Sequence, residues 1–460
     1  MKNIHKMLVA SIITGALVGC GSDSKDDIGS SYLRVFHASP DAPEVNVWLD
    51  GKPALLGVDY QQSSGQIRVD AGNHRVQVDA ILPDGSSLTV IPETNLDLMA
   101  DIEYNVVAAG KAAQLGTDDV NAFTPKIVSR NALVPQGARV QAMHGAPDVP
   151  MVDIYITAVD ADLTDVQPFA NDISYLEVSE AVEVPAGSYQ IRITSATNSS
   201  TVYFDSGAVQ VPSGGDWFAV ATYNTEAGVS PVNLLVDTGS DSLVVRDKYN
   251  GSNLRVVHTI SDAPGVDVWV NGIAPAMGSP LDNLTFKGST DYLAVPAGNY
   301  TFDVAVNGSD PVAVVGALSL DASLLAAVNY TALAIGNLDD AVDNDQLLVV
   351  TDDTRRLATA AKLRAIHTST LAGNVDIYIS ADNTPSDDDV KLSNISYKGD
   401  STMLQVSPGE VYVIVTPADD INTIAIGPAL FNLTAGSITT LVAIDDPEAL
   451  TGVSVISLDD

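Results

Sequence analysis

Four of the chain's six histidines stand at equivalent places in a repeated motif. An asparagine or aspartate follows each of these histidines after nine residues, and a tryptophan or tyrosine follows after eleven. In three copies an aspartate also lies four residues after the histidine, where the fourth copy has Leu371. The motif residues, copy by copy, are His37, Asp41 and Asn46; His144, Asp148 and Asp153; His258, Asp262 and Asp267; and His367 and Asp376.

Each histidine could meet the aspartate or asparagine nine residues later across a hairpin. A buried imidazole must satisfy its N–H group, and a carboxylate or amide oxygen can accept that hydrogen bond. We therefore favour a structural role for these pairs. A metal site is the alternative, although it needs at least three ligands. An acid–base dyad is disfavoured, because Asn46 replaces the carboxylate in the first copy.

The motif also contains a turn rich in proline and an aromatic residue. The first copy reads Ala-Ser-Pro-Asp-Ala-Pro over residues 38–43, and the side chain of its aspartate can cap a turn. We expect this turn to set the path between two strands, with ligand contact by its tip as the alternative. We interpret the aromatic residues as core residues, with a glycan-stacking platform as the alternative. They are Trp48, Tyr155, Trp269 and Tyr378.

The chain is strongly acidic. Its 460 residues include 58 acidic and 22 basic side chains, which gives a formal charge of −36. Such a surface repels nucleic acid and anionic headgroups, so neither is an expected partner. Clustered aspartates in loops can supply oxygen ligands to Ca²⁺, but we expect solvated loops here and keep calcium as the alternative. The clusters are Asp118 and Asp119; Asp339, Asp340, Asp343 and Asp345; Asp352 and Asp353; and Asp387, Asp388 and Asp389.

Sequence motifs for catalysis are absent. No histidine is followed by glutamate as in zincins, and neither a Gly-x-Ser-x-Gly elbow nor a phosphate-binding loop occurs. We therefore expect no enzymatic activity and no cofactor.

The N-terminus has the features of an export signal. Lys2 and Lys6 precede an apolar run over residues 7–18 that is too short to span a membrane. The tetrapeptide that ends at Cys20 resembles a bacterial lipobox, which implies that residues 1–19 are removed and that Cys20 is lipidated. An ordinary signal peptide is the alternative. The Gly-Ser pair that follows implies an outer-membrane lipoprotein, facing the periplasm or the exterior, with residues 20–31 as a flexible tether.

Short alternating segments between turn residues indicate that the rest of the chain is all-β. Val45–Leu49 alternates like a half-buried strand, and Asp50-Gly51 and Asn271-Gly272 are hairpin signals. Tyr104–Ala109 is a nearly continuous apolar run, as expected for a strand buried deep in a sandwich.

The motif returns at intervals of about 110 residues, which is the size of a domain. We predict four tandem antiparallel β-sandwiches of immunoglobulin-like or transthyretin-like type, over residues 32–130, 134–245, 253–352 and 361–460, the last one divergent. Because the linkers are short and polar, we expect a semi-extended string of self-sufficient domains.

The stretch from His37 to Pro43, followed by Val-Asn-Val-Trp, resembles the signature of the domain of unknown function 4397 family. The second and third copies are similar to it too, and the Val-Pro-Ala-Gly turns at Val184 and Val295 resemble the family's second motif. The resemblance implies tandem domains in exported, lipid-anchored or wall-anchored bacterial proteins, without assigned catalytic residues.

We therefore expect a protein held at the membrane by a lipid on Cys20, acting as a non-enzymatic, adhesion-like binding and spacer module. Linked weak modules gain by effective concentration, which favours repetition. The alternative is a carbohydrate-binding or carbohydrate-active envelope protein, with a glycan as its partner instead of another envelope protein. A row of exposed aromatic residues would favour a glycan reader, and two carboxylates in a cleft would favour a hydrolase.

Overall fold

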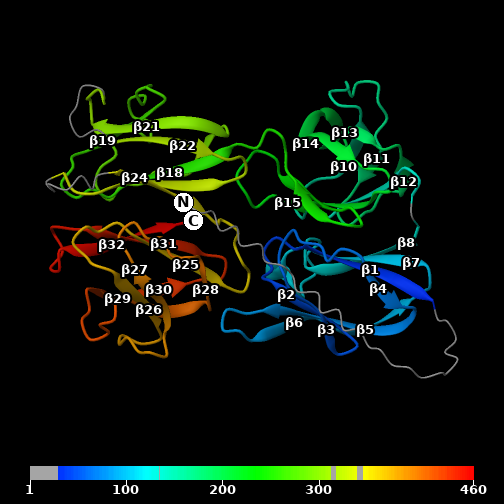
Figure 1. Ribbon diagram of the computed structural model, residues 1–460, viewed down its shortest axis with the longest axis horizontal. Helices are drawn as coiled ribbons and strands as arrows, with labels where there is room; N and C mark the ends of the chain where they lie inside the picture. Colours follow the sequence, from blue (N-terminus) through cyan, green and yellow to red (C-terminus); the bar gives the residue numbers. More distant parts are fainter. Residues whose placement is uncertain (1–28, 134, 312–317, 339–345) are drawn as a thin grey trace.

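The computed structural model describes residues 29–133, 135–311, 318–338 and 346–460. Within these ranges the chain is built of β-strands and one 3-10 helix, η1 (Ala112–Gln114). No helix in the described part of the chain is long and apolar enough to cross a membrane. Figure 1 shows four lobes of paired sheets, which are tandem β-sandwich-like domains.

Each domain consists of an inner sheet and an outer sheet, and the inner sheet contains the strand with the motif histidine at or next to its end. In domain 1 the inner sheet has the order β4-β1-β7-β8 and the outer sheet β3-β2-β5-β6. The strands of domain 1 are β1 (Ser30–Ala38), β2 (Val45–Leu49), β3 (Lys52–Val58), β4 (Ile67–Asp70), β5 (Gly72–Ile81), β6 (Ser87–Leu98), β7 (Ile102–Ala109) and β8 (Thr124–Asn131).

Domain 2 repeats this arrangement with inner order β12-β9-β15-β16-β17 and outer order β11-β10-β13-β14. Its strands are β9 (Ala138–His144), β10 (Val152–Thr157), β11 (Ala170–Ile173), β12 (Val182–Val184), β13 (Gly187–Ser195), β14 (Asn198–Val211), β15 (Asp216–Tyr223), β16 (Val232–Asp237) and β17 (Ser242–Val245).

Domains 3 and 4 have inner orders β20-β18-β23-β24 and β28-β25-β31-β32, and outer orders β19-β21-β22 and β27-β26-β29-β30. The strands of domain 3 are β18 (Ser252–His258), β19 (Val266–Val270), β20 (Leu293–Val295), β21 (Gly298–Val306), β22 (Leu318–Leu324), β23 (Asn329–Ile335) and β24 (Gln346–Asp352). Those of domain 4 are β25 (Ala361–His367), β26 (Val375–Ser380), β27 (Val390–Ile395), β28 (Leu404–Val406), β29 (Gly409–Pro417), β30 (Ile426–Leu433), β31 (Ile438–Asp445) and β32 (Val453–Asp459).

The alternating segments and hairpin signals are confirmed as strands and turns. The predicted Val45–Leu49 strand coincides with β2, and the same position in the other copies holds β10, β19 and β26. Asp50 and Gly51 have φ angles of 51° and 73°, and Asn271 and Gly272 have φ angles of 51° and 72°. Two consecutive positive φ angles are those of a type I′ turn, which matches the twist of the strands it joins.

The prediction of purely antiparallel sheets is wrong for one strand pair in each inner sheet. Strands β1 and β7 run parallel, as do β9 and β15, β18 and β23, and β25 and β31. The chain leaves β1 for the outer sheet and returns into β7 beside the start of β1, where the backbone N–H of Asp101 donates to the carbonyl of Ser30 (2.8 Å). Because both strands start at the same edge, they must run in the same direction. Ser30 and Ser31, which we expected in the tether, already belong to β1.

The expected string of separate domains is also wrong, because the domains pack in pairs through their inner sheets (Figure 1). A buried apolar cluster joins domains 1 and 2, and a second one joins domains 3 and 4. The first contains Phe36, Ala38, Val107, Ala109, Met143, Phe218, Val220 and Leu235. The second contains Val257, Leu333, Ile335, Val350, Ile366, Val442, Ile444 and Leu458.

The inner strands can pair in this way because they are apolar on both faces. Along β1, Leu33 and Val35 point into the sandwich core, whereas Phe36 points to the other domain. Along β7, Val106 packs against the core and Val107 lies in the interface. The continuous apolar run therefore does not indicate depth within one sandwich. It indicates a strand covered on one side by its own outer sheet and on the other by a second domain.

The linker between domains 3 and 4 is fixed to domain 1. Between domains 3 and 4, Arg355 donates to the carbonyl of Ala42 (2.9 Å) and lies 2.5 Å from Asp59 of domain 1. The backbone N–H of Ala358 donates to the carbonyl of Asp41 (2.8 Å). These contacts connect the second domain pair to the first. They hold in place a linker that we expected to be free because of its polar composition.

Replacement of the interface residue Phe36 by alanine should lower the free energy of unfolding by about 3–5 kcal/mol, because it removes a fully buried ring and leaves a cavity. The ring packs against Phe218 of domain 2, with 5.2 Å between the ring centroids. Urea unfolding of the chain from Gly29 to Asp460 measures the loss. Leu56→Ala is the matched control in the same domain, because Leu56 is 61 % exposed; it should change the free energy by less than about 0.5 kcal/mol. Equal effects of the two substitutions would show that Phe36 is not in an interface in solution.

Candidate functional site: the histidine motif and the faces that pair the domains

The four motif histidines are buried, and each one closes its own turn. In every copy Nε2 lies within hydrogen-bond distance of the backbone carbonyl six residues later, and each histidine is at most 1 % exposed. The pairs are His37 with Pro43 (3.0 Å), His144 with Pro150 (3.2 Å), His258 with Pro264 (3.1 Å) and His367 with Gly373 (2.9 Å). The expected hydrogen bond to the aspartate or asparagine nine residues later is therefore wrong.

The protonation state of the imidazoles follows from these partners. A carbonyl oxygen can only accept, so Nε2 carries the proton and donates it. In the third and fourth copies Nδ1 accepts the backbone N–H groups of Ile260 and Ser369, both at 3.3 Å, which requires a free lone pair. Burial lowers the pKa of all four histidines below its ordinary value of 6.5, and the carbonyl partners only partly oppose this. The four imidazoles are therefore neutral.

An aromatic turn that the sequence did not reveal packs against each histidine. Its ring lies nearly perpendicular to the imidazole, and its backbone pairs with that of the histidine. The pairs, with centroid distances, are His37 and Tyr60 (6.1 Å), His144 and Tyr175 (6.1 Å), His258 and Phe286 (6.3 Å), and His367 and Tyr397 (6.4 Å). The turn follows the histidine at a different distance in each copy, so it has no fixed register in the sequence.

A hydroxyl four residues after each aromatic residue fastens this turn to the inner sheet. In all four copies the side-chain oxygen accepts the backbone N–H of the residue two positions before the histidine. The donor and acceptor residues are Val35 and Ser64, Ala142 and Ser179, Val256 and Thr290, and Ala365 and Ser401. An aromatic residue followed after four positions by serine or threonine is thus the signal that could have located the turn.

The asparagine or aspartate nine residues after the histidine holds a β-bulge in the outer sheet in the first, second and fourth copies, and a turn beside that sheet in the third. Its side-chain oxygen accepts the backbone N–H of a residue with positive φ, where the strand register shifts or the neighbouring segment turns. The pairs are Asn46 with Gly57 (3.0 Å), Asp153 with Asp172 (2.8 Å), Asp267 with Asn283 (2.9 Å) and Asp376 with Asn394 (2.7 Å). An amide oxygen accepts this bond as well as a carboxylate does, which explains why asparagine serves in the first copy.

The histidine and this residue cannot meet, because they face different layers. Phe36 points to domain 2, so its neighbour His37 turns toward the sandwich side of the inner sheet. In β2, Val45 and Val47 point into the core, so Asn46 points away from it. The two side chains thus lie on either side of the outer sheet.

The aspartate four residues after the histidine ties the motif to the loop that follows the parallel strand. Asp41 accepts the backbone N–H groups of Ala112 (2.6 Å) and Ala113 (3.0 Å) at the start of η1. Asp262 accepts that of Leu338 (3.1 Å). These aspartates thus bind the backbone of a distant segment and not that of their own turn. In the fourth copy Asp445 takes this role and binds the loop that contains Leu371.

Asp148 differs, because it reaches into the neighbouring domain. It forms an ion pair with Lys111 and accepts a hydrogen bond from the side chain of Asn121 (2.7 Å), both from domain 1. The copy of the motif in domain 2 thus takes part in domain pairing.

The aromatic turns take part in domain pairing as well. The Tyr60 hydroxyl donates to the carbonyl of Tyr223, and the Gln61 side chain donates to the Thr222 hydroxyl (2.9 Å), both in domain 2. In the other pair Lys287, the residue after Phe286, lies 2.8 Å from Asp446 of domain 4. The histidine motif therefore shapes the end of the inner sheet that touches the partner domain.

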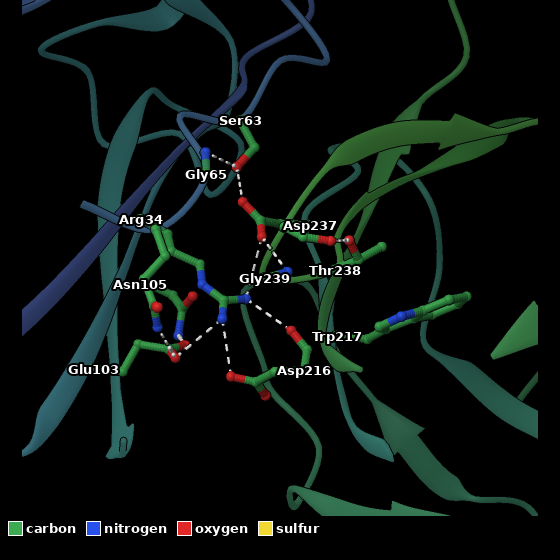
Figure 2. Close-up of polar contacts among 12 residues, drawn as sticks. Arg34, Ser63, Gly65, Glu103, Asn105, Asp216, Trp217, Asp237, Thr238 and Gly239 are labelled. Carbon is green, nitrogen blue, oxygen red and sulfur yellow. Dashed lines mark hydrogen bonds and ion pairs between the residues drawn. The ribbon is translucent and has the colours of Figure 1, made fainter. Parts of the chain in front are cut away.

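Beside the apolar cluster of domains 1 and 2 lies a group of six buried charges. Domain 1 contributes two arginines and one carboxylate, and domain 2 contributes one arginine and two carboxylates, so the charges balance across the interface. Figure 2 shows Arg34 between Glu103 of its own domain (3.1 Å) and Asp216 of domain 2 (2.9 Å). Asp237 lies 3.3 Å from the same guanidinium. Arg130 and Arg139 complete the group and contact both Glu103 and Asp216.

The charges of this group perturb one another in opposite directions. Burial alone would raise the pKa of Asp216, but the hydrogen bond from Arg139 and the charges of Arg130 and Arg34 hold it below its usual range. Desolvation lowers the pKa of Arg130 despite the neighbouring carboxylates. The group is thus a network of mutually compensating ions.

Domains 3 and 4 use equivalent charges. Arg255 of domain 3 lies 2.6 Å from Asp460 of domain 4, and Arg364 of domain 4 forms an ion pair with Asp352 of domain 3. Arg34, Arg255 and Arg364 each stand three residues before a motif histidine. A Leu-Arg-x-x-His pattern thus marks these arginines in three copies, but residue type alone does not predict a buried arginine whose partner is unknown.

The four aromatic motif residues lie on the outer face of the outer sheet, so their interpretation as sandwich core is wrong. Trp48 and Trp269 are partly exposed. Tyr155 and Tyr378 are only 4 % and 2 % exposed. Lys391 covers the Tyr378 ring at 5.1 Å.

The acidic clusters do not converge. Asp352 and Asp353 are paired with Arg364 and Lys362, and the clusters at residues 118–119 and 387–389 lie on exposed loops. The cluster at residues 339–345 lies outside the described residues, as does Cys20. Among the described residues, no three His, Cys, Asp or Glu side chains are arranged to hold a metal ion.

The neutral histidines predict a pH dependence of stability. Because their pKa values are lowered in the folded state, the unfolded state binds more protons below pH 6.5. Stability is therefore complete above pH 6.5 and falls on acidification, by up to about 1.4 kcal/mol per pH unit for each imidazole. His258→Gln should reduce this slope between pH 6.5 and 5.5 in urea unfolding. His74 is the control, because its pKa is raised by Asp50 in spite of partial burial, so His74→Gln should not reduce the slope. An unchanged slope in His258→Gln would show that this histidine is not neutral and buried.

The ion group predicts a second effect. Arg34→Met should lower the free energy of unfolding by about 3–5 kcal/mol, because it leaves buried carboxylates without their counter-charge. Arg75→Met is the control in the same domain, because Arg75 pairs with Glu93 at the surface, where both side chains are about half exposed; its effect should stay below about 1 kcal/mol. Urea unfolding compares them. A loss in Arg34→Met no larger than in the control would contradict burial of the group.

Comparison with known families agrees with the repeat. The model of a domain of unknown function, DUF4397, matches residues 31–155, 138–243 and 252–378. A search among curated proteins found no match. The matched ranges cover well over half of the sequence and include all four histidine motifs. The chain therefore belongs to the DUF4397 family and carries tandem copies of its domain.

Proposed function

We propose that this chain is a lipid-anchored protein of the cell envelope whose four domains act as a non-enzymatic, adhesion-like binding and spacer module. The observation that carries the proposal is the pairwise packing of the domains through buried apolar clusters. A protein that only holds a binding surface away from a membrane benefits from such stiffness. The docking of the linker residue Arg355 on domain 1 supports the same role, because it limits movement between the pairs.

The anchor belongs to the same proposal. The lipobox-like tetrapeptide that ends at Cys20 supports lipidation, and the Gly-Ser pair after it supports the outer membrane, with the domains facing the periplasm or the exterior. We assign the sandwiches to the immunoglobulin-like or transthyretin-like type, supported by two face-to-face sheets of about four strands in each domain.

A specific feature favours a carbohydrate-binding function as the second candidate. Trp48 lines a hollow of about 240 Å³ on the outer sheet of domain 1, beside Arg75, Gln77, Asp79 and Glu93. An aromatic face flanked by polar side chains can stack on a sugar ring and hydrogen-bond to its hydroxyls. Trp269 occupies the equivalent position in domain 3.

Lipidation is tested with the full-length chain in a bacterial host fed an alkyne-labelled fatty acid. We expect label on the protein and its recovery with the outer membrane, and loss of both in Cys20→Ser. Ser22→Ala is the control and should keep the label. Unlabelled wild-type protein would contradict the anchor.

The binding function is tested with the chain from Gly29 to Asp460 on isolated bacterial envelopes. A spacer that contacts envelope proteins should bind envelopes treated with periodate, which oxidises glycans, and should lose binding after protease treatment. The opposite pattern, together with at least tenfold weaker binding of Trp48→Ala, would support the carbohydrate function. Tyr249→Ala is the control for loss of a surface aromatic residue, because Tyr249 is 67 % exposed and lies far from Trp48 in the sequence. Saturable binding to neither material would contradict both functions.

A further inference from the structure

Domain 1 contains a pocket between its two sheets, with a volume of about 130 Å³. Its walls are almost wholly aliphatic, and Thr94 and Asn95 are its polar residues. The apolar lining includes Leu49, Leu55, Ile67, Val76, Leu96 and Val106. All six point into the sandwich, yet each is still partly exposed, because the pocket opens to solvent.

The equivalent lining residues are buried in the other domains. The position of Val76 is held by Ile191, Phe302 and Val413, which are 6 %, 5 % and 4 % exposed. The position of Val106 is held by Ala219, Ala332 and Leu441, at 5 %, 7 % and 2 %. The same positions are thus closed in three sandwiches and open in one.

A smaller side chain and a core with few aromatic residues accompany the pocket in domain 1. Where domains 2 and 3 place Tyr189 and Tyr300 against the core, domain 1 has the shorter side chain of His74. It lies within hydrogen-bond distance of the Asp70 carbonyl, as the tyrosine hydroxyls do of the equivalent carbonyls of Pro185 and Pro296. The core cluster of domain 1 includes one aromatic side chain, Tyr104, and the hydroxyl of that residue is held at the end of the sandwich by Asp97 and Met99.

We propose that domain 1 binds a small apolar molecule with one polar end, of the size of a single aromatic ring. An apolar cavity of about 150 Å³ in another protein is known to stay dry and to bind benzene, so a pocket of this size and lining suits such a ligand. Burial of the apolar part provides the affinity. The Thr94 side chain, which lies opposite Val76 on the same face of the sheet, can hydrogen-bond to a hydroxyl at the mouth. The pocket lies between the sheets, apart from both the Trp48 hollow and the domain interface, so this proposal does not depend on the proposed function.

The test uses phenol as the probe and the chain from Gly29 to Asp460, with binding measured by titration calorimetry. We expect saturable binding at one site. Val76→Ile and Val76→Phe introduce the residues that domains 2 and 3 have at this position, so both should keep the fold. The first should weaken binding several-fold, and the second should weaken it at least tenfold while raising the unfolding temperature, because it fills the pocket. Leu56→Phe is the control with an added ring on an exposed site of the same domain, and it should bind as the wild type does.

Two results would overturn the proposal. The first is the absence of saturable phenol binding by the wild type. The second is that both Val76→Ile and Val76→Phe bind phenol with wild-type affinity, because the probe would then bind elsewhere. If Val76→Phe does not fold, wild-type affinity in Val76→Ile alone has the same meaning. Phenol binding bears on this pocket alone, whereas binding to envelopes bears on the proposed function, so failure of one leaves the other standing.

Discussion

Each inner sheet carries apolar side chains on both faces, and the rest of the architecture depends on this. One face packs on the outer sheet of the same domain. The other face carries residues such as Phe36, Val220, Val257 and Val442, which are fully buried in the whole chain. These residues would be exposed to water if the domain stood alone. Burial of apolar area is the main favourable contribution to folding and association, so each domain needs a partner. Pairing of domains 1 and 2 and of domains 3 and 4 meets this need within one chain.

The repeated motif and the buried charges give that pairing its geometry. The neutral histidine closes the turn after the inner strand and supports the aromatic turn, from which Tyr60 and Lys287 reach the partner domain. The positive and negative charges of the six buried ions between domains 1 and 2 pair with one another only when the two faces meet in one relative position. Buried ion pairs add little net stability, but a mismatched one is costly, so we attribute to Arg34 and its partners the choice of register more than the strength of the interface.

The sequence predicted those features that a short segment determines by itself. Alternation located β2 and its counterparts, and the Asp50-Gly51 and Asn271-Gly272 pairs located type I′ turns, because in both cases neighbouring residues decide the conformation. The candidate site was harder to predict. The regular spacing of the histidines was visible, but the hydrogen-bond partner of each imidazole is a backbone carbonyl, which no residue type reveals. The aromatic turn lies at a variable distance from the histidine, and the run Tyr104–Ala109 looks the same whether its second cover is an outer sheet or another domain.

The most direct test of the account is whether domains 1 and 2 hold one fixed arrangement in solution. Spin labels on Asp84→Cys and Thr197→Cys mark exposed turns of the two outer sheets, and a chain that begins at Gly29 has no other cysteine. Double electron–electron resonance should give a single narrow distribution of distances between the two labels. High salt should leave this distribution unchanged, because an apolar interface determines the arrangement of the domains. A broad distribution, as expected for domains joined by a flexible linker, would contradict the pairing.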